Sequence, residues 1–158
     1  MSRKEIRPED LTVVIDTREK RPLVFSKMKT IRKSLPTGDY SILGLEKHIC
    51  VERKSLPDLL MCVGRERKRF DEEMQRMLAY EARAIIVEAP KVDCIQGTER
   101  SKVHPNAVEG SLIGWNGQIH IEFAANPTQA ARYVSWFLWV HAKRRWEESK
   151  FLLKGLGL

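Results

Sequence analysis

The 158-residue sequence predicts one α/β domain in which a mixed central sheet is flanked by helices. Short β-branched runs alternate along the chain with longer segments of helical periodicity. An early glycine separates two of the short runs and indicates a hairpin, so the sheet is expected to contain antiparallel strands. There is no internal repeat, low-complexity tract or linker. We therefore expect a single domain over residues 1–150 and a frayed tail over residues 151–158.

The first half of the chain supplies four expected strands. Residues 11–15 form a short β-branched run that ends at a charged residue, which is typical of a buried strand. After a loop, residues 30–35 predict a second strand, stopped by a proline and a glycine. Residues 40–43 and 48–51 flank Gly44 and predict the two arms of a hairpin.

Helices follow the hairpin. Ser55 is a favourable N-cap, so a first helix should run from there to about Gly64. Residues 65–81 carry an apolar stripe at helical spacing and predict a second helix. Residues 84–87 predict another buried strand, and the polar residues 91–104 are expected to be irregular.

The remaining elements are a helix that begins at Pro105, an alternating strand over residues 119–123 and a last helix over residues 126–148. The last helix is apolar on nearly every side, so it needs burial on more than one face. A chain of this size offers limited core for that. We expect a homodimer formed through this helix; a central position within the monomer is the alternative.

Positive charge suggests a polyanionic partner. The 28 Lys and Arg residues outnumber the 21 Asp and Glu residues, which favours nucleic acid as a ligand. Two clusters of cations are the expected DNA-contacting residues, although solvated helix faces explain them equally well. They are Arg65, Arg67, Lys68 and Arg69 in one stretch, and Lys143, Arg144 and Arg145 in the other.

Several classes of protein are disfavoured. No apolar run approaches the roughly 20 residues of a membrane helix, and the N-terminus lacks the pattern of a secretory signal. We therefore expect no membrane association and a cytoplasmic location. The three cysteines are far apart and the four histidines lack metal-ligand spacing, which argues against a disulfide framework and a zinc site.

The informative residues lie at the two ends of the expected hairpin. Asp39 begins one arm, whereas Glu52, Arg53 and Lys54 end the other. Residues two apart in a strand project from the same face, so Glu52 and Lys54 should point together while Arg53 points away. Antiparallel pairing across the glycine can bring Asp39 opposite them.

This arrangement predicts phosphodiester hydrolysis. Two neighbouring carboxylates are unfavourable unless a cation neutralises them, and hard oxygen ligands suit Mg²⁺ or Mn²⁺. Such an ion polarises a phosphoryl oxygen and activates water, and Lys54 can orient that water or stabilise the developing charge.

Each residue taken alone also has a structural interpretation. Asp39 follows a Pro-Thr-Gly turn, and Glu52 with Lys54 could form a solvated strand face. Asp58 completes a capping box with Ser55, and there the structural interpretation is the better one. Two acidic residues after the first strand also have a structural interpretation, because they could be the polar end of that strand. They are Asp16 and Glu19.

The sequence also resembles the XPF-type structure-specific endonucleases. The matching signature is Gly38-Asp39, twelve residues, Glu52-Arg53-Lys54, three residues and Asp58. Residues 14–19 resemble the family's opening strand and D-x-R-E turn. Residues 65–76, 84–88 and 108–131 resemble its later helices and strands.

The resemblance implies a restriction-endonuclease-like fold with a PD-(D/E)XK-type core formed by Asp39, Glu52 and Lys54. It also implies supporting roles for five residues. Asp16 and Glu19 would lie near the metal, Arg18 near the scissile phosphate, and Arg53 and Asp58 would support the site. A homodimer through the C-terminal helices is implied as well.

The expected activity is therefore metal-dependent cleavage of branched, flap or junction DNA in repair or recombination. Many relatives carry a helix-hairpin-helix module after the nuclease, whereas this sequence ends shortly after its last expected helix. The domain could act alone, be a fragment or use a partner's DNA-binding surface. The alternative function is a non-catalytic DNA-binding or dimerisation subunit.

Overall fold

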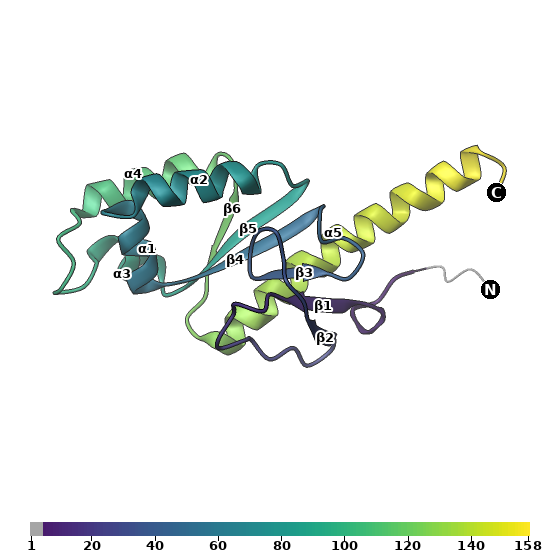
Figure 1. The fold of residues 1–158 in the computed structure, drawn as a ribbon, viewed down its shortest axis with the longest axis horizontal. Helices are drawn as coiled ribbons and strands as arrows, with labels where there is room; N and C mark the ends of the chain where they lie inside the picture. Colours follow the sequence, from purple (N-terminus) through teal and green to yellow (C-terminus); the bar gives the residue numbers. More distant parts are fainter. Residues whose placement is uncertain (1–4) are drawn as a thin grey trace.

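The computed structural model describes residues 5–158, and over this range the chain forms a six-stranded sheet flanked by five α-helices (Figure 1). The strands are β1 (Thr12–Ile15), β2 (Lys29–Arg32), β3 (Tyr40–Ile42), β4 (Ile49–Ser55), β5 (Ala82–Glu88) and β6 (His120–Phe123). The helices are α1 (Leu56–Val63), α2 (Arg67–Met77), α3 (Lys91–Gln96), α4 (Pro105–Asn116) and α5 (Pro127–Gly155).

The sheet is mixed, as the sequence predicts. Its strand order is β2-β1-β3-β4-β5-β6. Strand β3 runs antiparallel to both β1 and β4, whereas the β1–β2, β4–β5 and β5–β6 pairs are parallel. The predicted α/β class and the early hairpin are confirmed.

Each face of the sheet has its own core. Ile49 and Val51 of β4 pack on one face with residues of α5, including Val134 and Leu138. Cys50 points to the other face, where α1, α2 and α4 cover the sheet. Figure 1 shows α2 and α4 on the opposite side of the strands from α5. Because side chains alternate along a strand, the residues that follow on β4 are also divided between the two faces.

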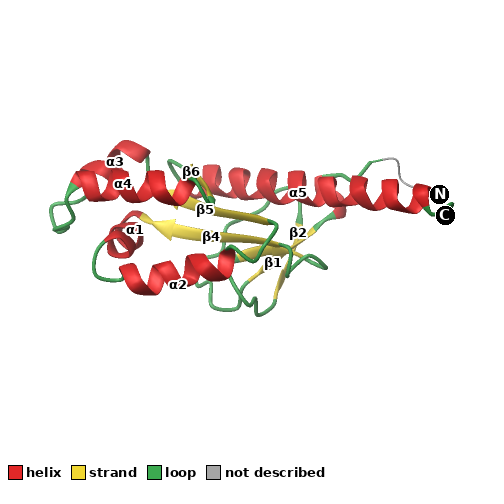
Figure 2. Ribbon diagram, turned by 90° about the horizontal axis from the view of Figure 1, so that it is seen from above, coloured by secondary structure: helices red, strands yellow, loops and turns green. Residues whose placement is uncertain are grey.

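Two expectations about helices are wrong. Residues 91–96 form α3 instead of irregular structure; Gly97, with a φ of +74°, follows its last residue. The last helix does not stop near Glu148 but continues to Gly155, because no proline or glycine interrupts the intervening residues. The segment expected to be frayed is therefore helical up to that glycine, and α5 extends well past the strands (Figure 2).

Helix α5 lies on the outside of the sheet and not at the centre of the monomer. Ala130, Val134, Leu138 and Ala142 form its buried stripe. On its other sides, Trp136 keeps 64% of its surface exposed, and Val140 keeps 46%. Within residues 5–158, no helix has the length and apolar character needed to cross a bilayer.

Candidate active site

The β3–β4 hairpin brings Asp39 beside β4. The backbone N–H of Asp39 donates to the carbonyl of Val51, and the N–H of Arg53 donates to Asp39 Oδ2, each over 2.8 Å. Gly38 makes this approach possible, because its φ is +81° and a Cβ there would lie 3.0 Å from the Val51 carbonyl oxygen. The glycine before Asp39 is therefore part of the site's construction.

Strand alternation places the next two polar groups as predicted. Glu52 and Lys54 face α2, and Lys54 Nζ lies 3.0 Å from Glu52 Oε1. The ammonium also lies 5.2 Å from the centre of the Phe70 ring, a cation–π contact. The side chains of Glu52 and Lys54 are only 12% and 14% exposed. The carboxylate and the ammonium are therefore held together in a largely dry environment.

The charges at this site are out of balance. Burial raises the pKa of Asp39 to about 6, and repulsion from Glu19 adds to the rise. The backbone hydrogen bond from Arg53 acts in the opposite direction and lowers this pKa. Burial and the neighbouring Asp39 raise the pKa of Glu52 well above its ordinary value. Although burial disfavours its charge, the pKa of Lys54 is raised by Glu52. One ammonium therefore serves more than one carboxylate, which is the condition that favours a further cation.

A third carboxylate completes the cluster. Glu73 of α2 places Oε2 3.4 Å from Lys54 Nζ, with its side chain 20% exposed. Glu73 was not among the site residues predicted from the sequence. The indication was present, because Glu73 lies on the same helical face as Phe70 and Met77 and so interrupts an otherwise apolar stripe.

The oxygen-rich cluster fits a hard divalent cation. Among residues 5–158, no three His, Cys, Asp or Glu side chains converge as a complete set of metal ligands. This is compatible with Mg²⁺, which commonly uses one or two carboxylates and completes its shell with water and substrate phosphate. Asp39 and Glu52 are carboxylates of the kind that such an ion uses.

Arg53 supports the site from the opposite face. Its guanidinium lies 2.7 Å from Glu88 Oε1 and 3.5 Å from Glu19 Oε2, and it also donates to the carbonyl of Arg21. Glu19 accepts a 3.4 Å hydrogen bond from the Tyr40 hydroxyl as well. Because the backbone N–H of Arg53 binds Asp39, this network fixes the strand segment that orients the Asp39 carboxylate.

Asp16 connects two loop segments near the site through hydrogen bonds. Its buried carboxylate accepts hydrogen bonds from the Leu35 N–H at 2.8 Å and from Arg18 Nε at 2.7 Å. Although burial acts in the other direction, the Arg18 hydrogen bond and two backbone N–H groups lower the pKa of Asp16. The hydrogen bond to Asp16 raises the pKa of Arg18, and the charges of Asp39 and Glu52 add to the rise. The Arg18 side chain remains 69% exposed. Arg18 thus lies beside the acidic cluster with its outer surface open.

Asp58 lies at the start of α1. Its Oδ2 accepts from the Ser55 hydroxyl at 2.8 Å, and its N–H donates to Ser55 Oγ. The bond to Ser55 Oγ is the predicted N-cap. The Asp58 carboxylate binds the Ser55 hydroxyl and not its backbone N–H, so the predicted capping box is only half formed.

The predicted DNA-contacting cations lie at and before the start of α2 and in α5. Lys68 and Arg69 are exposed, and Arg69 makes only a 3.5 Å contact with Glu66. In contrast, Arg145 lies 2.6 Å from Glu81, an ion pair within the protein. Similar pairs join the other cations of the α5 cluster to acidic residues. They are Lys143 with Glu5 and Arg144 with Glu148.

Comparison with known proteins identifies the family. Residues 15–137 match the family model of the ERCC4 domain, a span that includes every residue of the cluster and of its supporting network. The chain belongs to the ERCC4 domain family. The predicted resemblance to XPF-type structure-specific endonucleases is confirmed. No curated protein gives a significant sequence match to this ERCC4 domain.

Two solved structures are similar to the ERCC4 domain described here. XPF from Aeropyrum pernix is 25% identical with a TM-score of 0.66, over 80% of this chain and 59% of that one. XPF from Aeropyrum pernix in complex with DNA is also 25% identical, with a TM-score of 0.68 over 85% of this chain. The chain spans 59% and 66% of the length of these two relatives. The restriction-endonuclease-like fold is confirmed.

The raised pKa of Asp39 predicts an unusual pH dependence of stability. A carboxyl group with a pKa near 3.8 when unfolded and about 6 when folded binds more protons in the folded state. Its stabilising contribution is full below pH 3.8 and is lost as the pH rises through 6. We expect the metal-free ERCC4 domain to lose stability relative to Asp39→Asn between pH 4 and 7, by on the order of 1–3 kcal/mol.

This difference can be measured by urea unfolding of both proteins in EDTA at several pH values. Comparing the two variants cancels the contributions of titrating groups outside the cluster. The pKa of Glu52 responds to the replacement, because Asp39 helps to raise it. A constant difference in unfolding free energy across this pH range would contradict the predicted environment of Asp39.

Proposed function

We propose that this ERCC4 domain is a Mg²⁺- or Mn²⁺-dependent endonuclease that hydrolyses phosphodiester bonds at or near branched, flap or junction DNA. The observation that carries the proposal is the enclosed cluster of Asp39 and Glu52 beside the Lys54 ammonium. A cluster of buried carboxylates with raised pKa values lowers the stability of the fold. A non-catalytic subunit would gain nothing from keeping such a cluster.

Asp39 and Glu52 would hold the cation. When bound, the ion supplies Lewis acidity to a phosphoryl oxygen and lowers the pKa of a coordinated water. Arg53 would not compete with the cation for these two carboxylates. It binds Asp39 through its backbone N–H and directs its guanidinium to the other face of the sheet.

Lys54 would stabilise charge and not accept a proton. Its pKa is raised by Glu52, so the side chain stays an ammonium throughout the neutral range. An ammonium donates hydrogen bonds and offers no acceptor, so Lys54 would donate to the attacking water or to a phosphate oxygen. Glu73 would keep this ammonium in position through the contact to its Oε2.

The choice of DNA as substrate rests on charge and on family. The chain carries a net charge of +7, which favours a polyanion. One of the two similar XPF structures is of a complex with DNA. Branched DNA is proposed because the family consists of structure-specific nucleases, and phosphate contacts by exposed cations such as Lys68 and Arg69 would position the duplex without reading its sequence.

The decisive experiment incubates the purified protein with labelled flap, fork, four-way junction and linear DNAs in Mg²⁺, Mn²⁺ or EDTA. We expect cleavage of the branched substrates with either metal and none in EDTA. Tight binding without cleavage under every condition would support the alternative, a non-catalytic DNA-binding or dimerisation subunit.

We also propose that the protein is a homodimer through α5. Beside β6, this helix borders a cavity of about 690 Å³ whose lining includes Tyr133, Trp136, Phe137 and Val140. Trp136 and Val140 are exposed, and Tyr133 and Phe137 are half-buried. Apolar surface of this kind is typical of association surfaces. Two copies related by a twofold axis would bury the same face on each other.

Replacement of Val140 tests the dimer. Val140→Glu places a charge on this face, so the homodimer should dissociate at least ten-fold more readily, as measured by light scattering at several concentrations. Ile113→Glu is a matched control, because Ile113 is an apolar residue that is 68% exposed on α4. A monomeric wild type, or equal dissociation in both variants, would contradict the assignment.

A further inference from the structure

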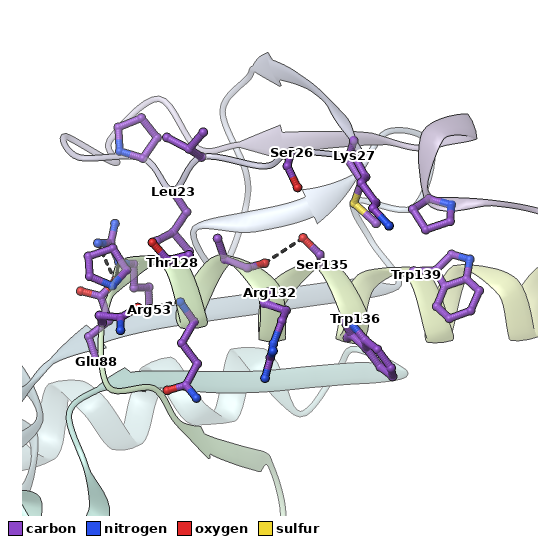
Figure 3. A pocket seen from close by; sticks show the side chains of 18 of the residues that line it. Leu23, Ser26, Lys27, Arg53, Glu88, Thr128, Arg132, Ser135, Trp136 and Trp139 are labelled. Carbon is purple, nitrogen blue, oxygen red and sulfur yellow. Dashed lines mark hydrogen bonds and ion pairs between the residues drawn. The ribbon is translucent and has the colours of Figure 1, made fainter.

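The face of the sheet that carries α5 contains a groove of about 1420 Å³ (Figure 3). One wall is the loop over residues 21–28, and the other is formed by residues 127–139 of α5. The ion pair between Arg53 and Glu88 lies at one end of the groove beside Thr128, and Trp139 lies at the other end. The groove therefore begins directly behind the catalytic strand and runs along the helix.

Unpaired cations gather around this groove. Arg21, Lys27 and Arg132 belong to its lining and are exposed. Among residues 5–158, no carboxylate forms an ion pair with the side-chain nitrogens of these three residues, whereas Glu88 is neutralised by Arg53. The Glu19 carboxylate accepts only from the backbone N–H of Arg21, and Arg132 lies over the Tyr133 ring. The lining therefore has three cationic side chains without an ion-pair partner among the described residues, and the complementary ligand is a polyanion.

Two indole rings accompany these charges. Trp136 is 64% exposed, and Figure 3 shows it projecting from the same helix as Arg132. Trp139 is held in place, because its Nε1 donates to the Ile6 carbonyl at 3.2 Å and Lys143 stacks on its ring at 5.3 Å. Trp136 is thus the exposed indole of the groove, whereas Trp139 is partly buried. A positive groove with an exposed aromatic side chain binds single strands, whose unpaired bases stack while the cations follow the phosphates. A duplex offers no free base faces to such a surface.

We propose that this groove binds single-stranded DNA, namely the unpaired strand next to the scissile bond of a branched substrate. The identity of the nucleic acid rests on the proposed function. Arg53 supplies the connection, since its backbone N–H holds Asp39 in the active site while its guanidinium lies at the end of the groove. A strand that leaves the active site around this edge of the sheet enters the groove between the loop and α5.

The test combines Lys27→Glu with Arg132→Glu in the full chain. Binding of labelled (dT)20 and of a duplex of equal length is measured in EDTA by fluorescence anisotropy, over a series of salt concentrations. We expect (dT)20 affinity to fall at least ten-fold and duplex affinity less than three-fold. The slope of log affinity against log salt for (dT)20 should fall in magnitude by about 1.4, because two phosphate contacts are lost. The quenching of tryptophan fluorescence that (dT)20 causes in the wild type should be lost in this double variant.

A matched pair of charge reversals serves as the control. Lys91→Glu with Arg100→Glu removes two exposed cations from α3 and the loop after it, outside the groove. Equal losses in both double variants would show a general charge effect and overturn the proposal, as would unchanged (dT)20 binding in the groove variant. Light scattering of each variant checks that the oligomeric state is preserved, since Arg132 and Trp136 also border the cavity proposed for the dimer.

The groove and the nuclease activity can fail separately. A protein that binds (dT)20 through Lys27 and Arg132 but never cleaves DNA would refute the proposed function and leave the groove intact. A protein that cleaves branched DNA with metal but binds (dT)20 equally well after both charge reversals would retain its function without this groove.

Discussion

Replacement of either proposed metal ligand by its amide, in Asp39→Asn or Glu52→Gln, should lower the cleavage rate by roughly 10³-fold. The amides keep the shape of the side chains but lose the negative charge that attracts a hard cation. Binding to branched DNA should change less than three-fold, because the phosphate contacts come from cations elsewhere on the surface. Single-turnover cleavage and anisotropy measure the two effects on the same preparations.

The same variants carry an internal check on folding. Removal of one carboxylate relieves repulsion in the cluster, so Asp39→Asn should be more stable than wild type at pH 8 in EDTA. Asp71→Asn is the matched control on α2, where Asp71 is half exposed and pairs with Arg67 away from the site. Loss of cleavage in the control, or parallel loss of cleavage and DNA binding in the two amide variants, would contradict the metal-ligand assignment.

Arg53→Met should destabilise the folded protein by about 3 kcal/mol. The guanidinium is 14% exposed and neutralises Glu88 and Glu19, whose side chains are 16% and 13% exposed. Methionine fills similar space but leaves both carboxylates enclosed without a partner. Urea unfolding in EDTA measures the loss directly.

A double-mutant cycle identifies the cause of this loss. Arg53→Met combined with Glu88→Gln should recover a large part of the stability, because the unpaired charge and not the missing contact area is responsible. Arg53→Lys should fall between the two, since an ammonium keeps the charge but cannot reach two carboxylates with a planar fork. If Arg53→Met lowers the free energy of unfolding by less than about 1 kcal/mol, the ion-pair network around Arg53 contributes little to the stability of the fold.

Local patterns in the sequence predicted the arrangement of side chains on β4 well. The period of two along β4 indicated that Glu52 and Lys54 share a face while Arg53 points away, and the structure has this arrangement. The pairing of Ser55 with Asp58 was also visible in the sequence, because the capping box is a contact within one helical turn. Such features depend on residues that are neighbours along the chain.

The supporting network could not be predicted in the same way. Glu88 lies 35 residues from Arg53, so their contact depends on the parallel pairing of β4 with β5 and not on any local pattern. The groove behind the site likewise requires the loop over residues 21–28 to face α5, which only the packed structure shows. Glu73 could be predicted in part. Its position on the apolar stripe of α2 indicated that it is buried, but no local pattern indicated that it contacts Lys54.

The central claim is that Asp39 and Glu52 together bind a divalent cation beside the ammonium of Lys54. Crystals of the protein soaked in Mn²⁺ test it most directly through anomalous diffraction. We expect a strong anomalous peak about 2.0–2.3 Å from an oxygen of each carboxylate, and no such peak in crystals of Asp39→Asn. A peak elsewhere, with no peak between these two side chains, would contradict it.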